Sequence, residues 1–560
     1  TSPVSRPRAS AGPRLVPDRE ALLQVNTDDT TEQLAAAIRR RRTFAIISHP
    51  DAGKTTLTEK LLLYGGAIHL AGSVKARRAQ RHATSDWMKL EQERGISVTS
   101  SVMQFEYEGF QINLLDTPGH EDFSEDTYRT LVAADSAVML LDNRRGVEAR
   151  TRQLFDVCRR RRMPIFTFVN KCDRVGEDPL KLVSDVEADL GIACHATTWP
   201  IHEEGAFVGV YDRRNRLVHV FDRDKDHGAR RAAVQVTSLD DAALGEVLGT
   251  EALERLAHDI HLLDEAGHPF DLDSLRAGEL SPVFFGSAIT NFGVEPFLRE
   301  FLQLAPPPLP RESSEGLVEP TDPSFSGFVF KIQANMDPRH RDRVAFVRIC
   351  SGRFEAGMQV THVRSGKPMR LSAPQTFLAR ERSAVEEAWP GDVIGILDRG
   401  TLRIGDTVAE DARLEFSGIP RFAPEHFARI VTGDPMRRKQ LDAGLRQLSE
   451  EGAAQVFYTS ATDIAGPSPI VGAVGLLQFD VMLHRLEYEY GVACRLEKFG
   501  GRYPRWVTGP AADIDRVARD PGRTLLFDAR GNPLMLFDTE WSMRWTLDNE
   551  RGLTFHDVAP

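Results

Sequence analysis

The sequence has few cysteines, and those it has are scattered. No two of its five cysteines form the Cys-x-x-Cys spacing that is typical of zinc sites and redox motifs. They are Cys158, Cys172, Cys194, Cys350 and Cys494. This pattern predicts a protein of a reducing compartment without a zinc site, and we expect it to be cytoplasmic.

Long hydrophobic runs are also missing. No apolar stretch reaches the roughly 18 residues that a membrane span needs, and the N-terminus has no apolar signal core. The first fourteen residues contain arginine and serine without acidic residues. Pro3, Pro7 and Pro13 would nevertheless break the amphipathic helix of a transit peptide. We therefore predict no membrane association.

An excess of positive charge is absent as well. The 560 residues carry 70 lysines and arginines against 81 aspartates and glutamates, a net charge of −11. Any contact with a nucleic acid therefore needs a local basic patch. Arg159–Arg162 and Arg339–Arg343 are candidates for contact with RNA or protein, although a solvated surface is the simpler interpretation of each. The ordinary share of hydrophobic residues, 41%, excludes a wholly disordered chain.

Shifts in composition divide the chain into several parts. Residues 1–40 are expected to form a flexible N-terminal extension, and 41–310 an α/β domain with a small inserted hairpin region near 197–230. A proline-rich linker then leads to a β-barrel over 311–410, where short alternating runs are separated by glycine turns. Residues 411–560 are predicted to form an α+β domain of two layers, with helices over Met436–Ser449 and Leu476–Tyr488. Its last sixty residues fit no clear pattern.

Short apolar runs alternate with helical stretches in the first large domain. This alternation predicts a doubly wound, largely parallel sheet. The expected strands are Phe44–Ile47, Ile112–Leu115, Ala137–Leu141, Ile165–Val169 and Val283–Phe285. We also expect a helix that starts near Thr30 and ends in a solvated run, Arg39–Arg42, and one helix over Asp240–Leu263.

A loop with the composition of a phosphate-binding loop follows the first expected strand. Backbone N–H groups and a helix N-terminus can bind phosphate oxygens there, with a glycine where a side chain would collide. Lys54 is placed to reach the terminal phosphates and Thr55 to ligate Mg²⁺. The generic pattern begins with glycine, whereas Ser48 stands here. The candidate residues are Ser48, His49, Pro50, Asp51, Ala52, Gly53, Lys54, Thr55 and Thr56.

Three further polar motifs follow other expected strands. They are Asp116-Thr117-Pro118-Gly119, Asn170-Lys171-Cys172-Asp173 and Ser287-Ala288. Ligands of open α/β sheets bind at the carboxyl ends of the strands, so these motifs and the phosphate loop are expected to meet. The carboxylate of Asp116 can hold Mg²⁺ through water, and the N–H of Gly119 can meet the γ-phosphate.

Asp173 indicates which base is bound. A carboxylate can accept hydrogen bonds from both the N1–H and the 2-amino group of guanine, and adenine offers no such pair. The N–H of Ala288 could donate to guanine O6. A site built on hydrogen bonds rejects a mismatched analogue by about 10⁴–10⁵-fold, so we predict GTP and GDP as ligands.

These motifs resemble those of the translational GTPases, and more narrowly those of the bacterial peptide chain release factor 3 family. In the motif Asp116–His120 a histidine stands where many signalling GTPases have glutamine, and Arg94-Gly95-Ile96-Ser97 is similar to the first switch. The resemblance covers roughly residues 40–500, and Ser48 fits it. Its segments are Ser48–Thr56, Ser85–Met88, Arg94–Ser101, Val102–Gln104, Leu114–Arg129, Phe166–Asp173, Gly327–Phe346, Gly418–Glu425, Gln447–Phe457 and Val471–Asp480.

The resemblance implies a monomeric GTPase of translation termination. It would bind the ribosome after peptide release and promote dissociation of the codon-reading, class 1 release factors, with hydrolysis stimulated by the ribosome. His120 would position or activate the attacking water, in either charge state. Ser97 would join Thr55 and Asp116 at Mg²⁺. Asp51 would help to bind K⁺ or would simply cap the loop.

The sequence is also compatible with other functions. An elongation-type, translocase-like GTPase would carry about two further domains, for which about sixty residues are too few. A regulatory GTP-binding switch and a metabolic P-loop kinase are further alternatives. The kinase would have no use for Asn170–Asp173. Assays of GTP and ATP hydrolysis with and without ribosomes would separate these classes, except for the translocase.

Overall fold

The computed structural model describes most of the chain. The described residues are 31–67, 100–222, 234–239, 241, 244–334, 343–371, 375–378, 381–419, 421–459 and 469–559. Thr30, the segments 85–88 and 94–99 and the basic residues 339–342 lie outside them. The predicted role of Ser97 and residues 1–30 of the expected N-terminal extension therefore lie outside the described residues.

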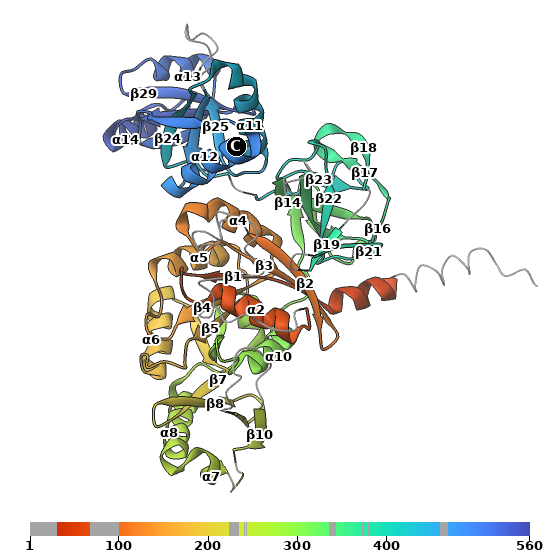
Figure 1. Ribbon diagram of the computed structural model, residues 1–560, viewed down its shortest axis with the longest axis vertical. Coiled ribbons are helices and arrows are strands. Elements are labelled where there is room, and N and C mark those ends of the chain that lie inside the picture. Colours follow the sequence, from red (N-terminus) through yellow and green to blue (C-terminus); the bar gives the residue numbers. More distant parts are fainter. Residues whose placement is uncertain are drawn as a thin grey trace, which may run out of the picture.

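A seven-stranded sheet forms the centre of the first large domain (Figure 1). Its order is β2-β3-β1-β4-β5-β11-β6, and every neighbouring pair is parallel except β2 with β3. The strands are β1 (Arg41–Ser48), β2 (Ser101–Tyr107), β3 (Phe110–Asp116), β4 (Ser136–Asp142), β5 (Ile165–Asn170), β6 (Ala193–Ala196) and β11 (Leu280–Phe285). The predicted doubly wound α/β fold is confirmed.

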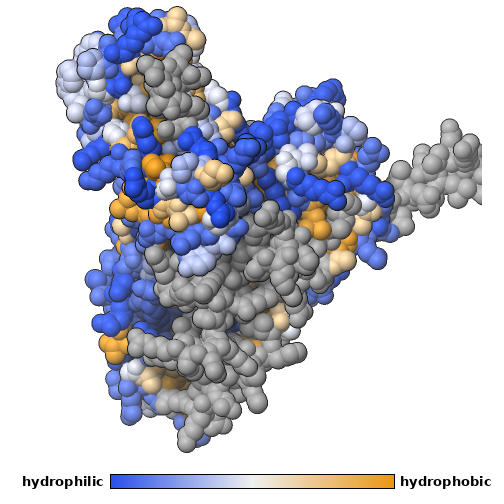
Figure 2. Space-filling view, turned by 45° about the horizontal axis from the view of Figure 1, so that its top comes forward, coloured by the Kyte–Doolittle hydropathy of each residue, from blue (hydrophilic) through white to orange (hydrophobic). Residues whose placement is uncertain are grey.

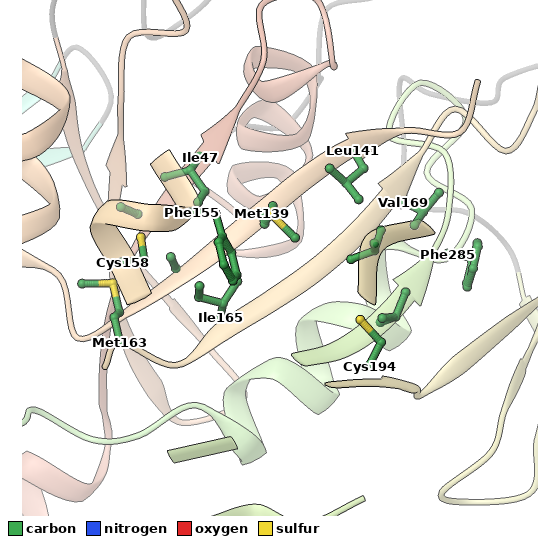
Figure 3. Packing of buried hydrophobic residues seen from close by; sticks show 14 of the residues in the cluster. Ile47, Met139, Leu141, Phe155, Cys158, Met163, Ile165, Val169, Cys194 and Phe285 are labelled. Atoms are coloured by element: carbon green, nitrogen blue, oxygen red, sulfur yellow. The ribbon is translucent and has the colours of Figure 1, made fainter. Parts of the chain in front are cut away.

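Helices cover both faces of this sheet, which explains why its strands are continuous apolar runs. One face packs against α4 (Ser124–Ala133), α5 (Ala149–Arg160) and α6 (Pro179–Leu190), and Figure 3 shows Phe155 of α5 among side chains of β1, β4 and β5. The other face packs against α2 (Lys54–Tyr64), α9 (Leu272–Arg276) and α10 (Val294–Leu304).

The structure of the arginine run Arg39–Arg42 differs from the predicted helix end. Residues 31–39 are helical, but Arg41 and Arg42 belong to β1. Arg41 Nε lies 2.8 Å from Asp392 Oδ2, and Arg42 Nε donates to the carbonyl of Leu302 at 2.9 Å. The prediction of a solvated helix end was wrong for these two residues, because polar partners far along the chain bind both guanidinium groups.

The insertion near 197–230 contributes to a second, four-stranded antiparallel sheet of order β10-β9-β8-β7. Its strands are β7 (Thr198–Glu203), β8 (Ala206–Asp212), β9 (Leu217–Phe221) and β10 (Val234–Ser238). The single helix predicted over Asp240–Leu263 was wrong. Two helices, α7 (Leu244–Leu248) and α8 (Thr250–Ala266), are separated at Gly249, whose φ of 75° interrupts the helix.

The next domain is an antiparallel β-barrel. A short ribbon precedes it, β12 (Arg311–Ser313) with β13 (Gly316–Val318). The barrel strands are β14 (Ser326–Ala334), β15 (Arg343–Ser351), β16 (Phe354–Glu355), β17 (Gln359–His362), β18 (Lys367–Arg370), β19 (Gln375–Leu378), β20 (Glu381–Ala384), β21 (Glu387–Ala388), β22 (Val393–Leu397) and β23 (Thr407–Ala409).

The C-terminal domain is built on one eight-stranded sheet of order β27-β24-β26-β25-β29-β30-β28-β31. The predicted helices are present, with η4 (Pro435–Arg437) before α11. The last sixty residues extend the same sheet, because β25 pairs with β29. The elements are β24 (His426–Thr432), α11 (Arg438–Glu450), β25 (Gln455–Tyr458), β26 (Pro469–Ala473), α12 (Leu476–Tyr490), β27 (Cys494–Lys498), β28 (Tyr503–Thr508), α13 (Ala511–Ala518), β29 (Arg523–Asp528), β30 (Pro533–Phe537), α14 (Glu540–Asn549) and β31 (Thr554–His556).

The described surface of the face shown in Figure 2 is largely hydrophilic, with hydrophobic residues in small groups. Among the described residues, the helices are too short or too polar to span a bilayer.

Candidate functional site

The predicted phosphate loop joins the end of β1 to the start of α2. Asp51 and Gly53 both have left-handed backbones, with φ of 66° and 102°. Gly53 is the N-cap residue of α2. Because glycine has no side chain that could cap the helix, the first N–H groups of α2 face the loop without a capping side chain. Among the described residues, the buried hydroxyl of Ser48 has no hydrogen-bond partner. A loop of this kind fits an anion.

Lys54 and Asp116 connect the phosphate loop to the end of β3. The Lys54 ammonium donates to Asp116 Oδ1 at 2.7 Å and also to the carbonyl of Thr117, and both side chains of the ion pair are buried. The Thr117 hydroxyl donates to the carbonyl of Ile46 in β1 at 2.7 Å. Thr55 follows Lys54 and is half-buried, as is Thr56. The Thr55 hydroxyl and the Asp116 carboxylate each offer hard oxygen donors of the kind that Mg²⁺ prefers.

Asn170 joins three of the predicted motifs. Its Nδ2 donates to the carbonyl of Ala52 at 2.9 Å, and its Oδ1 accepts from the N–H of Ala288 at 2.8 Å. A Cβ at Gly53 would overlap Asn170 Nδ2, so only glycine permits this approach. The N–H of Ala288, predicted to face guanine O6, is thus directed at Asn170 instead.

Asp173 lies beside the loop that follows β11. The hydroxyl of Ser287 donates to Asp173 Oδ1 at 2.6 Å, and the N–H of Cys172 donates to the carbonyl of Gly286 at 3.1 Å. Burial raises the pKa of the Cys172 thiol to about 12, so it stays protonated and packs as an apolar group. These contacts fix the backbone that presents the Asp173 carboxylate.

Sequence reasoning missed Asp142, at the end of β4. Lys171 Nζ donates to Asp142 Oδ2 and to the carbonyl of Asp51, each at 2.6 Å. Burial opposes ionisation of Asp142, but hydrogen bonds from Lys171 and the N–H of Arg144 outweigh it and lower its pKa. Its place at the carboxyl end of a parallel strand could have identified it.

His202, in the inserted sheet, was also missed. Its Nε2 lies 3.1 Å from the carbonyl of Cys172. Burial lowers the pKa of His202, so the neutral ring is favoured and Nε2 carries the proton in this contact. The insertion therefore supports the loop of Asp173. Nothing local in the sequence marks this pair.

His120 follows Gly119 of the motif Asp116–His120 and is partly exposed. It caps the short helix η2 (Glu121–Phe123), because Nδ1 accepts from the N–H of Asp122 at 3.3 Å. The preceding Gly119 lies against Pro50 of the phosphate loop, where a Cβ would sit 3.6 Å from the Pro50 Cα. Pro118 is buried. The other histidine of the predicted site, His49 of the phosphate loop, has its Nε2 3.5 Å from Glu148 Oε1.

The basic patches are only partly solvated. Arg343 is buried in an ion pair with Asp398 at 3.2 Å, so the interpretation as solvated surface was wrong for this residue. Arg159 and Arg161 donate to the carbonyls of Leu190 and Leu131 at 3.2 and 2.7 Å.

Three family models match successive parts of the chain. The Elongation factor Tu GTP binding domain matches residues 39–307, and Elongation factor G domain 2 matches 324–411. The model described as Class II release factor RF3, C-terminal domain, matches 416–547.

Similar proteins extend over nearly the whole chain. A protein of Symbiobacterium thermophilum named Peptide chain release factor 3 is 56% identical over 94% of this chain and 99% of its own length. One of Gloeothece citriformis with the same name is 52% identical over 95% and 98%. A crystal structure of a protein from Thermus thermophilus has a TM-score of 0.65 at 23% identity, covering 84% of this chain and 71% of the other.

Proposed function

Because the chain belongs to the peptide chain release factor 3 family, we propose that it acts in translation termination as a ribosome-stimulated GTPase. It hydrolyses GTP to GDP and phosphate and so promotes the dissociation and recycling of class 1 release factors after peptide release. The observation that carries this proposal is that one chain combines a match to a GTP-binding domain with a match to the C-terminal domain of the release factor 3 family. The partners are the ribosome and the release factors, and we expect a cytoplasmic monomer.

The phosphates of GTP would lie in the loop from Ser48 to Thr56. The N–H groups at the start of α2 would bind the phosphate oxygens, and Lys54 would pair with the terminal phosphates. Thr55, Asp116 and Ser97 would hold Mg²⁺. When bound, Mg²⁺ neutralises the charge that develops on the phosphate oxygens. We assign K⁺ to the neighbourhood of Asp51, whose carbonyl also accepts a hydrogen bond from Lys171.

The base would be read by Asp173 with Ser287 and Ala288 at its side. The Asp173 carboxylate would accept from guanine N1–H and the 2-amino group. Its contact with Ser287 fixes the orientation of the carboxylate. Asn170, Lys171 and Cys172 hold the loop in place through their contacts with neighbouring loops.

His120 would act on the water that attacks the γ-phosphate. It follows Gly119, whose N–H is assigned to that phosphate. Since its Nδ1 faces Asp122, Nε2 is the nitrogen that can meet the water. A neutral His120 ring would orient the water, and a protonated ring would stabilise the charge that develops on the phosphate.

The test is GTP turnover with and without ribosomes. We expect His120→Ala to keep GTP binding but to lower ribosome-stimulated turnover by about 10²–10⁴-fold, because a positioned acid–base group is lost. His268→Ala is the control, since the ring of His268 is exposed beside Glu187. Unchanged turnover in His120→Ala would contradict the assignment.

The translocase-like alternative has less support. The structure from Thermus thermophilus shares the fold, but the C-terminal model matched is that of the release factor. Following dissociation of class 1 release factors from terminated ribosomes separates the two. A regulatory GTP-binding switch would act without ribosomal stimulation of hydrolysis.

A further inference from the structure

Asp122 lies between His120 and the C-terminal domain. Its Oδ1 is 3.3 Å from His120 Nδ1 and accepts from that nitrogen when the nitrogen carries a proton; when it carries none, the N–H of Asp122 donates to it. Its other oxygen, Oδ2, accepts a hydrogen bond of 2.6 Å from the N–H of Leu477, 355 residues along the chain. One largely buried carboxylate therefore contacts the histidine and another domain at once.

The contact in the C-terminal domain is the N-terminus of α12. Gly475 stands at the N-cap of this fifteen-residue helix, so the capping carboxylate comes from Asp122. The helix N-terminus favours a negative charge at this point. The backbone of Gly475 is extended, with φ of −136°, so its conformation does not require glycine. A Cβ there would overlap the carboxyl group of Asp122. Glycine is therefore needed for space.

Further contacts join the same two surfaces. The Tyr128 and Phe422 rings meet with centroids 5.0 Å apart. Arg129 Nη1 donates to the carbonyl of Gly452 at 3.2 Å, and Gln455 Nε2 donates to Glu125 Oε2 at 3.3 Å. Because α4 and η2 are consecutive in the chain, a shift of the C-terminal domain on α4 also displaces Asp122.

We propose that Asp122 is a positioning residue for GTP hydrolysis. When His120 Nδ1 carries a proton, the Asp122 carboxylate accepts from it and orients the ring, and the N–H of Leu477 fixes that carboxylate. Docking of α12 on the GTPase domain thus sets the direction of His120 Nε2. A carboxylate behind a catalytic histidine fixes its ring in the same manner elsewhere. The proposal rests on the role of His120 proposed above.

The first test displaces the carboxylate from the opposite domain. We expect Gly475→Ala to lower the kcat of ribosome-stimulated hydrolysis by about 10- to 100-fold, because misplacement of a reacting group is costly. The KM for GTP should stay within about twofold, since no phosphate or base contact is altered. Gly433→Ala is the matched control, because a Cβ at this glycine of the same domain meets no atom within 4 Å. An unchanged kcat in Gly475→Ala, or an equal loss in Gly433→Ala, would overturn the proposal.

The second test asks whether both positions act through one contact. In an Asp122→Ala background, Gly475→Ala should change kcat by less than about twofold, because no carboxylate remains to be displaced. Fully additive losses, or a loss of GTP affinity by calorimetry that accounts for the lower turnover, would refute the coupling. If His120→Ala lowers turnover but Gly475→Ala does not, only this inference fails. If His120→Ala has no effect, the proposed function of His120 fails as well.

Discussion

Single side chains connect the loops of the nucleotide site. Asn170 uses both ends of its amide, one on the carbonyl of Ala52 and the other on the N–H of Ala288. Lys171 similarly joins Asp142 to the carbonyl of Asp51. Buried polar groups that satisfy one another in this way are costly to break. At the scale of single residues, side-chain type and hydrogen-bonding capacity decide how the loops at the carboxyl ends of the strands are arranged.

The base preference should change with one atom of Asp173. In Asp173→Asn the side-chain oxygen can still accept from Ser287, while the new amide can donate to the 2-oxo group of xanthine. We expect nucleotide preference to move from GTP towards XTP, because unpaired polar groups penalise the mismatched base. Competition binding with GTP, XTP and ATP measures this. Retained GTP selectivity would show that Asp173 does not read the base.

The elements that matter most are loops and helix ends. The phosphate loop depends on Gly53 at the N-cap of α2. At the C-terminus of α4, the last carbonyls accept from cationic side chains: Arg161, Arg311 and Arg348 donate to carbonyls between Leu131 and Ala134. Positive charge at a helix C-terminus is favourable. The C-terminal end of α4 is thus held by side chains outside the helix.

Gly53→Ala should disrupt the nucleotide site at the level of the loop. A Cβ would overlap Asn170 Nδ2 in addition to the strain at φ 102°. We expect calorimetry to show a large loss of affinity for GTP and GDP, because the bridge between two motifs must break.

Gly66→Ala is the control that separates the backbone strain of Gly53→Ala from its overlap with Asn170. Gly66 has φ of 70° but open space around it, so its variant carries the backbone cost of roughly 1–2 kcal/mol alone. Equal affinities in the two variants would mean that the overlap with Asn170 is unimportant.

The three large parts of the molecule meet at α4 (Figure 1). The barrel contributes Arg348, whose Nη2 lies 2.5 Å from Asp135 Oδ2, and both side chains are 1% exposed. Arg311 pairs with the other oxygen of Asp135 at 2.7 Å. The C-terminal domain contacts Asp122 of η2 and Tyr128 and Arg129 of α4. The region of η2, α4 and Asp135 therefore contacts both other domains.

Asp135→Asn should weaken the contact between the first domain and the barrel. The substitution keeps the shape of the side chain but leaves two arginines without their carboxylate. Breaking a buried ion pair costs about 3–5 kcal/mol, so we expect a lower midpoint of urea unfolding. Lys181→Gln is the control, because the ion pair of Lys181 with Glu177 is 59% and 47% exposed and such pairs contribute about 1 kcal/mol or less. Equal midpoints in both variants would count against the role of Asp135.

Local patterns in the sequence were enough for much of the fold. The parallel strands, the barrel and the helices α11 and α12 were predicted, because apolar periodicity and turn residues are local signals. The nucleotide motifs were placed at strand ends for the same reason. The contacts of Arg41 and Arg42, the break at Gly249 and the support from His202 were not predicted, since their partners are distant or their signals weak.

The sequence by itself thus determined which strands, loops and motifs the chain contains. Only the tertiary structure decided that the last sixty residues extend the sheet of the C-terminal domain, through pairing of Phe457 with Asp528. It alone decided that Asp122 meets Leu477 across 355 residues. Pairings over such distances depend on how separate layers pack, and packing leaves no periodic trace along the chain.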